Sequence, residues 1–376
     1  MREVFPTLKE LRIKQISEVK LVAKRDAIKV DSFESLIKEI AKLAYAHKDY
    51  LFFFRGQPFD YQNPNNSKST FYPSIYRPET KDGRISTQKL KKRFEILESS
   101  CILLIKLFEL KNIEGKNDVK QRKEIQWSIL QHYEVCDTPY LDLTQSLRVA
   151  CSFAVLSDKK PGETPNNGYL YVFALPYFTN RISVNSEHDL INIRLLSICP
   201  PEALRPHHQE GFLVGTTNIT HDYSVKQELD FNRTLIAKFV FKNKKSFWTN
   251  DSLIIHEDVL KPHIDRVGKI CQRIRNLNNE NVLAKPTESF KRLWKELETL
   301  IEPMQPDKKS VKDKMVHFRS FFSIDLIDPK AINNLCAFSI KLDKGVDCSK
   351  KEILENYLLL SLQKEEIEKN TGRLLS

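Results

Sequence analysis

Arg55, which follows a short apolar run, has the means to bind an anion. Residues 51–54 (Leu-Phe-Phe-Phe) are too short and too apolar for anything but a buried strand, and Arg55 comes directly after them. Its planar fork of donors suits a pyrophosphate or a carboxylate. A charged side chain at the end of a buried strand needs a partner, so Arg55 is predicted either to bind a ligand or to form a salt bridge, for which Asp142 is a candidate.

Hydroxyl groups, an imidazole and a phenol lie further along the chain, within fifteen residues of one another. Thr144 and Ser146 could hydrogen-bond a ribose or fix a strand end, and Thr144 suits the N-cap of the following helix even better. His132 could carry a proton, and Tyr133 could stack on an aromatic ligand, although packing against the core is the simpler interpretation of Tyr133. Whether these side chains form one site depends on the fold.

Motifs for metals and for several large enzyme classes are missing from the sequence. His207 and His208 are adjacent without a nearby set of ligands, which favours an exposed loop over a zinc site. No Gly-x-x-x-x-Gly-Lys-Ser/Thr, Gly-x-Gly-x-x-Gly or Gly-x-Ser-x-Gly sequence occurs, which argues against P-loop NTPases, Rossmann enzymes and α/β-hydrolases. The 7 cysteines include no Cys-x-x-Cys pair and are expected to be reduced. No cluster of carboxylates indicates a two-metal nuclease.

The elements that would position these groups mix helices and strands without a regular βαβ repeat. Apolar residues recur at helical spacing over 33–44 and 90–108, while 169–175 and 234–241 are typical of strands. Residues 147–156 are small or apolar enough for a helix that packs closely against a sheet. We therefore predict an α+β fold with mixed, mostly antiparallel sheets flanked by helices.

The chain is expected to divide near residue 275. The Asn-rich stretch 276–281 suggests a linker, and a helix is predicted to start at Pro286, with another after a capping box at 349–352. The predicted domains are 1–275 and a mainly helical extension, 276–376, whose role the sequence does not indicate.

Charge and hydropathy place the protein in the cytoplasm and leave its partners open. The formal net charge of +11 raises the chance of contact with phosphate-rich partners, yet acidic and basic residues are interleaved as on solvated helix faces. The first residues lack an apolar signal region, and no run of about 18 apolar residues could span a bilayer. We expect no membrane contact.

Four separated segments together resemble the FRG family, which is named for the sequence Phe-Arg-Gly. In order, they are 52–57 (Phe-Phe-Phe-Arg-Gly-Gln) with 72–77 (Tyr-Pro-Ser-Ile-Tyr-Arg), 131–133 (Gln-His-Tyr) with 138–154, the strand 168–173, and Arg205-x-x-x-Gln209-x-Gly211. One such segment alone would be weak evidence for the resemblance, but four segments in the same order are specific evidence. Leu143 departs from the family pattern, which has tryptophan there, and 134–137 replaces a shorter turn that contains glycine.

The FRG pattern in turn is similar to that of ADP-ribosyltransferases, which use an early strand arginine, a Ser/Thr-rich strand end and a late Gln/Glu element. The resemblance implies an ADP-ribosyltransferase-like core that binds NAD as substrate, in an effector of bacterial defence or toxin action. It implies cofactor-binding roles for Arg55, Gly56, Gln57, Tyr133, Asp142, Thr144 and Ser146, catalytic roles for His132, Gln209 and Glu210, and no metal.

Whether Gln209 or Glu210 faces the site decides whether the protein could transfer ADP-ribose or could only bind a nucleotide. Cleavage of the nicotinamide–ribose bond benefits from a carboxylate near the developing positive charge, and Gln209 cannot supply one. On a strand, neighbours point to opposite faces, so only one of the two can face the site. Glu210 facing in would make catalysis credible, whereas Gln209 facing in would suit binding alone.

A second hypothesis is a non-catalytic module that binds nucleic acid or a protein target. The basic surface and the C-terminal helices would then make the contacts, and phosphate binding would depend on salt. Binding to DNA or RNA that does not depend on Arg55 would favour this hypothesis over the first.

Overall fold

The computed structural model describes most of the chain, and the description below is restricted to those residues. They are 22–63, 67–78, 85–155, 167–178, 180–186, 189–217, 219, 231–241, 265–279, 282–302, 309–322 and 329–374. The chain divides into two compact units, which we describe separately. The sheet unit comprises 1–97 and 112–272, and the helical unit comprises 98–111 and 273–376.

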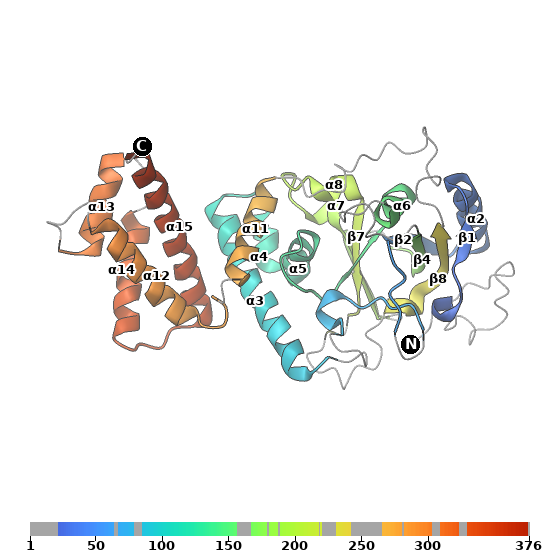
Figure 1. Ribbon diagram of the computed structural model, residues 1–376, viewed down its shortest axis with the longest axis horizontal. Helices are drawn as coiled ribbons and strands as arrows, with labels where there is room; N and C mark the ends of the chain where they lie inside the picture. Colours follow the sequence, from blue (N-terminus) through green and yellow to red (C-terminus); the bar gives the residue numbers. More distant parts are fainter. Residues whose placement is uncertain are drawn as a thin grey trace. The chain divides into compact units, whose positions relative to one another are not determined.

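One sheet of eight strands organises the described part of the sheet unit (Figure 1). The strands are β1 (Ile28–Val30), β2 (Tyr50–Gln57), β3 (Leu141–Thr144), β4 (Gly168–Pro176), β5 (Ile182–Asn185), β6 (Leu190–Arg194), β7 (Gly211–Gly215) and β8 (Leu235–Phe241). Their order is β1-β8-β4-β2-β3-β7-β6-β5. Neighbours are antiparallel except for β1 and β8, so the predicted mixed, mostly antiparallel α+β architecture is confirmed.

The register of β2 determines where Arg55 lies. This strand pairs with β4 along its whole length, from Tyr50 opposite Pro176 to Gln57 opposite Tyr169. On its other side it pairs with β3 at a single position, Phe54 opposite Thr144. The predicted strand end at residue 54 was therefore wrong, because β2 continues to Gln57, and Arg55 lies inside the strand beyond its one pairing with β3.

Helices and short 3₁₀ turns cover the sheet. In the sheet unit they are η1 (Val22–Lys24), α2 (Phe33–Ala46), η2 (Ser74–Tyr76), the start of α3 (Thr87–Leu110), α4 (Lys116–Gln121), α5 (Lys123–His132), α6 (Leu147–Val155), α7 (Leu195–Ile198), α8 (Arg205–Gln209), η3 (Phe231–Thr234) and the start of α11 (Arg266–Asn279). The strands 169–175 and 234–241 and the helix from 147 are confirmed as β4, β8 and α6, while residue 156 lies outside the described residues.

Close packing of α6 on the sheet depends on glycine. A Cβ atom on Gly56 would overlap the carbonyl oxygen of Ala150 and lie 2.8 Å from the backbone nitrogen of Ala154. A Cβ atom on Gly168 of the adjacent strand β4 would lie 2.6 Å from the carbonyl oxygen of Ala154. The helix backbone therefore rests directly on β2 and β4, which confirms the predicted close contact and holds the strand next to Arg55 in place.

Two apolar cores form on β2 and its neighbours, and alternation of side chains along the strand separates them. Phe54 belongs to the core that contains Leu36, Ala150 and Phe239, whereas Phe53 belongs to the core that contains Phe71. Successive strand residues point to opposite faces, so these two phenylalanines fix the orientation of the residues that follow.

The described residues of the helical unit form four further helices and the adjoining parts of α3 and α11. They are α12 (Pro286–Ile301), α13 (Val311–Phe322), α14 (Pro329–Asp343) and α15 (Lys350–Leu374). Phe290 and Phe338 pack edge to face with ring centroids 5.0 Å apart. Ser349 caps α15, because its Oγ accepts from the Glu352 backbone nitrogen; this is one of the two bonds of the predicted capping box, and the Glu352 carboxylate lies 3.5 Å from Lys341 Nζ. Of the linker predicted at 276–281, residues 276–279 form the end of α11, so the prediction was wrong there, and 280–281 lie outside the described residues.

No helix among the described residues is both long and apolar enough to cross a membrane.

Candidate functional site

Two cavities in the sheet unit meet at Arg55. The smaller, of about 180 Å³, is lined by Phe54, Arg55, Gly56, Gln131, His132, Glu134, Asp142, Leu143, Thr144, Ala150, Phe153, Leu195, Arg205, Gln209, Gly211 and Phe212. The larger, of about 540 Å³, is lined by Arg55, Gly56, Gln57, Pro58, Tyr61, Gln62, Asn63, Thr70, Phe71, Tyr72, Arg77, Pro78, Leu141 and Phe153. Arg55, Gly56 and Phe153 line both, so they separate two parts of one cleft.

The guanidinium of Arg55 has spare donors at this boundary. Its Nη1 donates to the backbone carbonyl of Asp142 at 2.6 Å, and its buried Nε has no hydrogen-bond partner. No ion pair joins the Arg55 and Asp142 side chains among the described residues, although their charges interact. Burial lowers the pKa of Arg55 the most, Asp142 opposes this effect, and the like charge of Arg77 lowers the pKa further. Of the two predicted alternatives, the salt bridge to Asp142 is therefore absent, and the guanidinium is open to an anion.

Asp142 is held by a glutamine that connects three segments of the chain. Gln131 Nε2 donates to Asp142 Oδ2 at 2.7 Å, and Gln131 Oε1 accepts from Thr138 Oγ1 at 2.7 Å. Ser74 lies 3.4 Å from the same Gln131 oxygen. Burial raises the pKa of Asp142, and the Arg55 charge and the Gln131 hydrogen bond offset part of that effect. Gln131 thus fixes the strand segment whose carbonyl binds Arg55.

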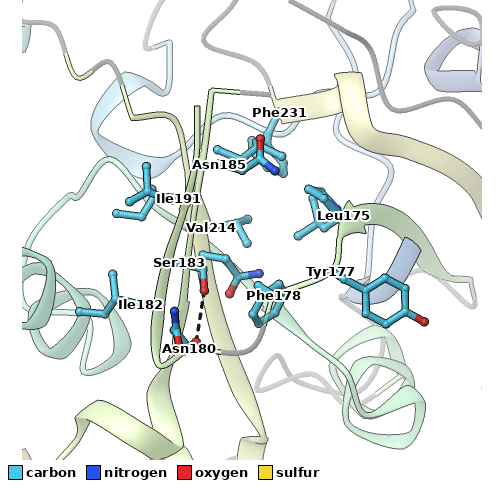
Figure 2. Close-up of a pocket in the computed structure, with 14 residues that line it drawn as sticks. Leu175, Tyr177, Phe178, Asn180, Ile182, Ser183, Asn185, Ile191, Val214 and Phe231 are labelled. Atoms are coloured by element: carbon cyan, nitrogen blue, oxygen red, sulfur yellow. Dashed lines mark hydrogen bonds between the residues drawn. The ribbon is translucent and has the colours of Figure 1, made fainter. Parts of the chain in front are cut away.

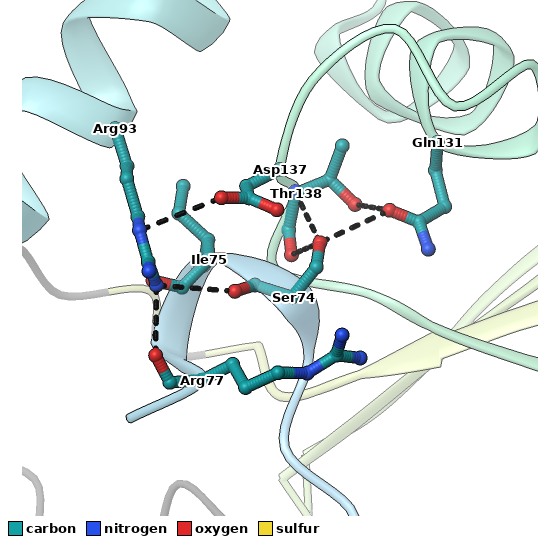
Figure 3. A network of polar contacts seen from close by, with 7 residues as sticks. All are labelled: Ser74, Ile75, Arg77, Arg93, Gln131, Asp137 and Thr138. Carbon is teal, nitrogen blue, oxygen red and sulfur yellow. Dashed lines mark hydrogen bonds and ion pairs between the residues drawn. The ribbon is translucent and has the colours of Figure 1, made fainter. Parts of the chain in front are cut away.

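The turn around Ser74 is fixed in turn by Arg93 of α3. Figure 3 shows its Nη1 directed at the backbone carbonyls of Ser74, Ile75 and Arg77, at 3.2, 2.9 and 2.9 Å. Its Nε lies 3.4 Å from Asp137 Oδ2. These contacts saturate the carbonyls at the end of η2 and so position the Arg77 backbone at the rim of the larger cavity.

His132 lies at the end of α5 and lines the smaller cavity. Burial lowers its pKa to about 3, the Arg205 charge acts in the same direction, and a hydrogen bond to the Arg205 backbone opposes both. Its Nε2 is buried without a hydrogen-bond partner. The imidazole is therefore neutral at physiological pH and a weak base, so its Nε2 suits a hydrogen-bond acceptor better than a proton carrier.

This depressed pKa predicts that acid destabilises the fold. Between pH 6.5 and about 3 the unfolded chain binds a proton at His132 that the folded chain does not, so stability falls as the pH falls. From pH 7 to pH 5 the loss is about 2 kcal/mol. His132→Gln should remove that part of the loss in urea unfolding at the two pH values, whereas the exposed His207→Gln should not; equal acid sensitivity in wild type and His132→Gln would contradict the assignment.

A glutamate that adopts a left-handed backbone lies at the mouth of the smaller cavity. Glu134 has φ 55° directly after the C-cap of α5, and the Val135 nitrogen bonds back to the Leu130 carbonyl, as in helix ends that usually have glycine there. Arg205 Nη2 donates to Glu134 Oε1 at 2.8 Å. The turn that departs from the FRG pattern therefore brings a carboxylate to the site.

Thr144, Gln209 and Glu210 meet where β3 and β7 begin to pair. Thr144 Oγ1 lies 3.1 and 3.2 Å from the carbonyls of Gln209 and Glu210, and it accepts from the Ser146 nitrogen at 3.0 Å. The hydroxyl thus connects two segments of the site and braces the turn before α6, which begins at Leu147, so Thr144 is not the N-cap itself.

Gln209 faces the smaller cavity and Glu210 does not. The predicted strand at these residues was wrong, because Gln209 ends the short helix α8 and Glu210 follows it with φ 44°. Gln209 is buried and lines the cavity, whereas Glu210 is exposed. His207 and His208, expected on a loop, are exposed residues of the same helix.

The larger cavity is electropositive and partly aromatic. Two arginines, Arg55 and Arg77, line it together with Tyr61 and Tyr72, and none of the described residues that line it is Asp or Glu. The loop that bears Tyr61 is anchored by Asp60. Burial raises the pKa of Asp60, but hydrogen bonds from Ser69, Gln62 and Lys238 lower it, and the net pKa lies below the ordinary value. The cavity thus has a rigid wall and a positive charge.

Most of the predicted site residues converge on the cleft. Arg55, Gly56, His132, Asp142, Thr144 and Gln209 line the smaller cavity, and Gln57 lines the larger one. Ser146 and Tyr133 line neither of them. Tyr133 donates its hydroxyl to Asp265 Oδ2 at 2.7 Å, which ties α5 to the start of α11.

Gln131, Glu134, Phe153, Arg205 and Arg77 line the cleft without having been predicted as site residues. Gln131, Arg205 and Arg77 belong to the segments that resemble the FRG family, so the signal that could have identified them was present in the sequence.

Among the described residues, no group of three or more His, Cys, Asp or Glu side chains is placed to hold a metal ion.

No protein-family model, curated protein or solved structure matches the chain.

Proposed function

We propose that this chain is an FRG-domain protein with an ADP-ribosyltransferase-like core, and that it binds an NAD-like nucleotide in the cleft around Arg55. The observation that carries the proposal is the position of this guanidinium between two cavities, with its buried Nε unpaired. An arginine with free donors at the boundary of a two-part cleft suits a pyrophosphate that joins two nucleosides.

The sizes of the two cavities support a ligand with one large and one small end. About 540 Å³ lies within the range of 300–1,000 Å³ that is typical of ligand pockets. About 180 Å³ is close to the roughly 150 Å³ of a cavity that holds one benzene ring. The adenosine end would bind beside Tyr61 and Tyr72, and the smaller ring beside His132 and Thr144.

The amide of Gln209 limits the chemistry. The carboxylates that line the smaller cavity are Asp142, which accepts from Gln131, and Glu134, which pairs with Arg205. Since Gln209 rather than Glu210 faces the cavity, ordinary ADP-ribosyl transfer is not part of the proposal. The proposed activity is nucleotide binding.

Arg55→Ala should weaken NAD binding about 10- to 100-fold in calorimetric titration, because a charged hydrogen bond contributes about 1.5–3 kcal/mol. Arg77→Ala should weaken it in the same direction, and the matched control Arg194→Ala, an exposed arginine outside both cavities, should not. Nicotinamide riboside, which lacks phosphate, should bind wild type and Arg55→Ala alike.

Two results would count against this function. Absence of saturable NAD binding by wild type would remove it. Salt-dependent binding of DNA or RNA that Arg55→Ala leaves unchanged would instead support the second hypothesis, a module that recognises nucleic acid through its basic surface.

A further inference from the structure

A third cavity of the sheet unit lies on the part of the sheet formed by β5, β6 and β7. Its volume is about 290 Å³, and none of its lining residues lines the two cavities at Arg55. Figure 2 shows Val214 and Ser183 on the side of the strands that faces Leu175 and Phe178, and Ile182 on the opposite side. The cavity therefore lies between one face of the sheet and the chain that follows β4, and part of it opens to the surface.

The walls of this cavity combine apolar and aromatic side chains with the polar side chains of Asn180, Ser183, Asn185 and Asn192. Leu175, Leu190, Val214 and Phe231 belong to one hydrophobic core, and Phe178 packs against that core. Phenylalanine rings present flat faces on which a planar ligand can stack. None of the described residues that line the cavity is charged, so mixed apolar and polar walls of this kind suit a small molecule with little charge.

Asn192 is the lining residue whose buried side chain has unpaired polar atoms. It lies on β6 between Ser183 of β5 and Val214 of β7, and its side chain shares a strand face with Leu190 of the core. Only 6% of the residue is exposed, and neither Oδ1 nor Nδ2 has a hydrogen-bond partner. Buried amides are normally paired, so this one calls for an explanation.

The hydroxyl of the neighbouring residue Ser183, unlike the Asn192 amide, has a hydrogen-bond partner. Ser183 Oγ lies 3.4 Å from the Asn180 carbonyl, as the dashed line in Figure 2 marks. The Asn192 amide is left with a donor and an acceptor side by side. Its terminal torsion is soft, so a modest rotation can turn that edge toward a molecule in the cavity.

We propose that this cavity binds a planar heterocycle whose edge carries a hydrogen-bond donor beside an acceptor, as a purine base such as adenine does. An asparagine amide pairs with the adenine N6 and N7 atoms through two hydrogen bonds. The volume is about twice that of a cavity that holds one benzene ring, which fits a two-ring system. The aromatic walls would stack on its faces.

The same edge belongs to a free base and to a base within single-stranded nucleic acid. Asn192 would recognise the base in the same way in both cases. Comparing the binding of adenine with that of a short oligo-deoxyadenosine shows whether the protein prefers the free base or the nucleic acid. Binding of either that depends on Asn192 supports the proposal.

Adenine and indole, titrated into the full chain and followed by calorimetry, test the proposal. Indole is of similar size and has one donor and no adjacent acceptor. Wild type should bind adenine, and Asn192→Leu should bind it at least tenfold more weakly while its affinity for indole holds. Asn192→Leu should also melt at or above the wild-type temperature, because removing an unpaired buried amide relieves its desolvation.

Asn192→Asp serves as a second variant of nearly the same shape, and its loss of the amide donor should weaken adenine binding as well. Arg55→Ala should leave adenine binding at this cavity intact, so failure here and failure of the proposed nucleotide cleft are distinguishable. Lack of saturable binding of both adenine and the oligonucleotide, or equal binding by wild type and folded Asn192 variants, would overturn the inference.

Discussion

Replacing Gly56 with alanine is expected to lower the free energy of unfolding of the sheet unit by more than about 4 kcal/mol, enough to unfold it in many conditions. The new Cβ atom would overlap the Ala150 carbonyl oxygen and crowd the Ala154 nitrogen. Both are backbone atoms of α6, so no rotamer change relieves the clash, and the helix must leave the sheet.

Circular dichroism during urea unfolding measures this effect. The control is Gly115→Ala, in the same unit, where a Cβ atom meets nothing within 4 Å and the positive φ of 79° alone costs about 1–2 kcal/mol. If Gly56→Ala were no less stable than Gly115→Ala, the packing of α6 on β2 would be wrong.

Lys238→Met is expected to cost about 3–5 kcal/mol, because it leaves a buried carboxylate without its cation. Lys238 Nζ lies 3.0 Å from Asp60 Oδ2, and their side chains are only 4% and 9% exposed. Asp60 also accepts from Ser69 and from the hydroxyl of Tyr171, at 2.6 and 2.9 Å. This network fixes the loop that carries Tyr61, so the variant should also weaken NAD binding.

Two comparisons isolate the charge. Adding Asp60→Asn to Lys238→Met should recover part of the stability, because no uncompensated charge then remains buried. Lys42→Met, which removes an exposed pair with Glu39, should cost less than about 0.5 kcal/mol. Chemical denaturation of wild type, the two single variants and the double variant measures their free energies of unfolding. If Lys238→Met lost as little stability as Lys42→Met, the anchoring role of Lys238 would be refuted.

Several parts of the site could be predicted because local sequence determined them. The apolar run before Arg55 and the adjacent Gly56 were sufficient to place a buried strand with an arginine near its end. Small residues on α6 indicated its close contact with the sheet. Convergence of Arg55, His132 and Thr144 followed from the order of the resembling segments, not from periodicity.

Other parts depend on contacts between distant segments and left no local signal. Pairing of β2 with β3 at one position opens the cleft, and no residue pattern in either strand reveals that register. Glu134 and Glu210 take left-handed backbone conformations that sequence statistics assign to glycine or asparagine. Asn192 lies on β6, a strand that no pattern in the sequence indicated.

The linker predicted at 276–281 was wrong at residues 276–279 for a related reason. The Asn-rich stretch from residue 276 has low helix propensity, yet it extends α11, because tertiary packing of Ile274 and Leu277, both buried, outweighs the weak preference of asparagine.

A crystal structure of the chain with NAD tests the central claim most directly. The account predicts phosphate oxygens within about 3 Å of the Arg55 guanidinium, with the adenosine end beside Tyr61 and the smaller ring beside His132. A nucleotide bound elsewhere, with Arg55 still donating to the Asp142 carbonyl alone, would contradict it.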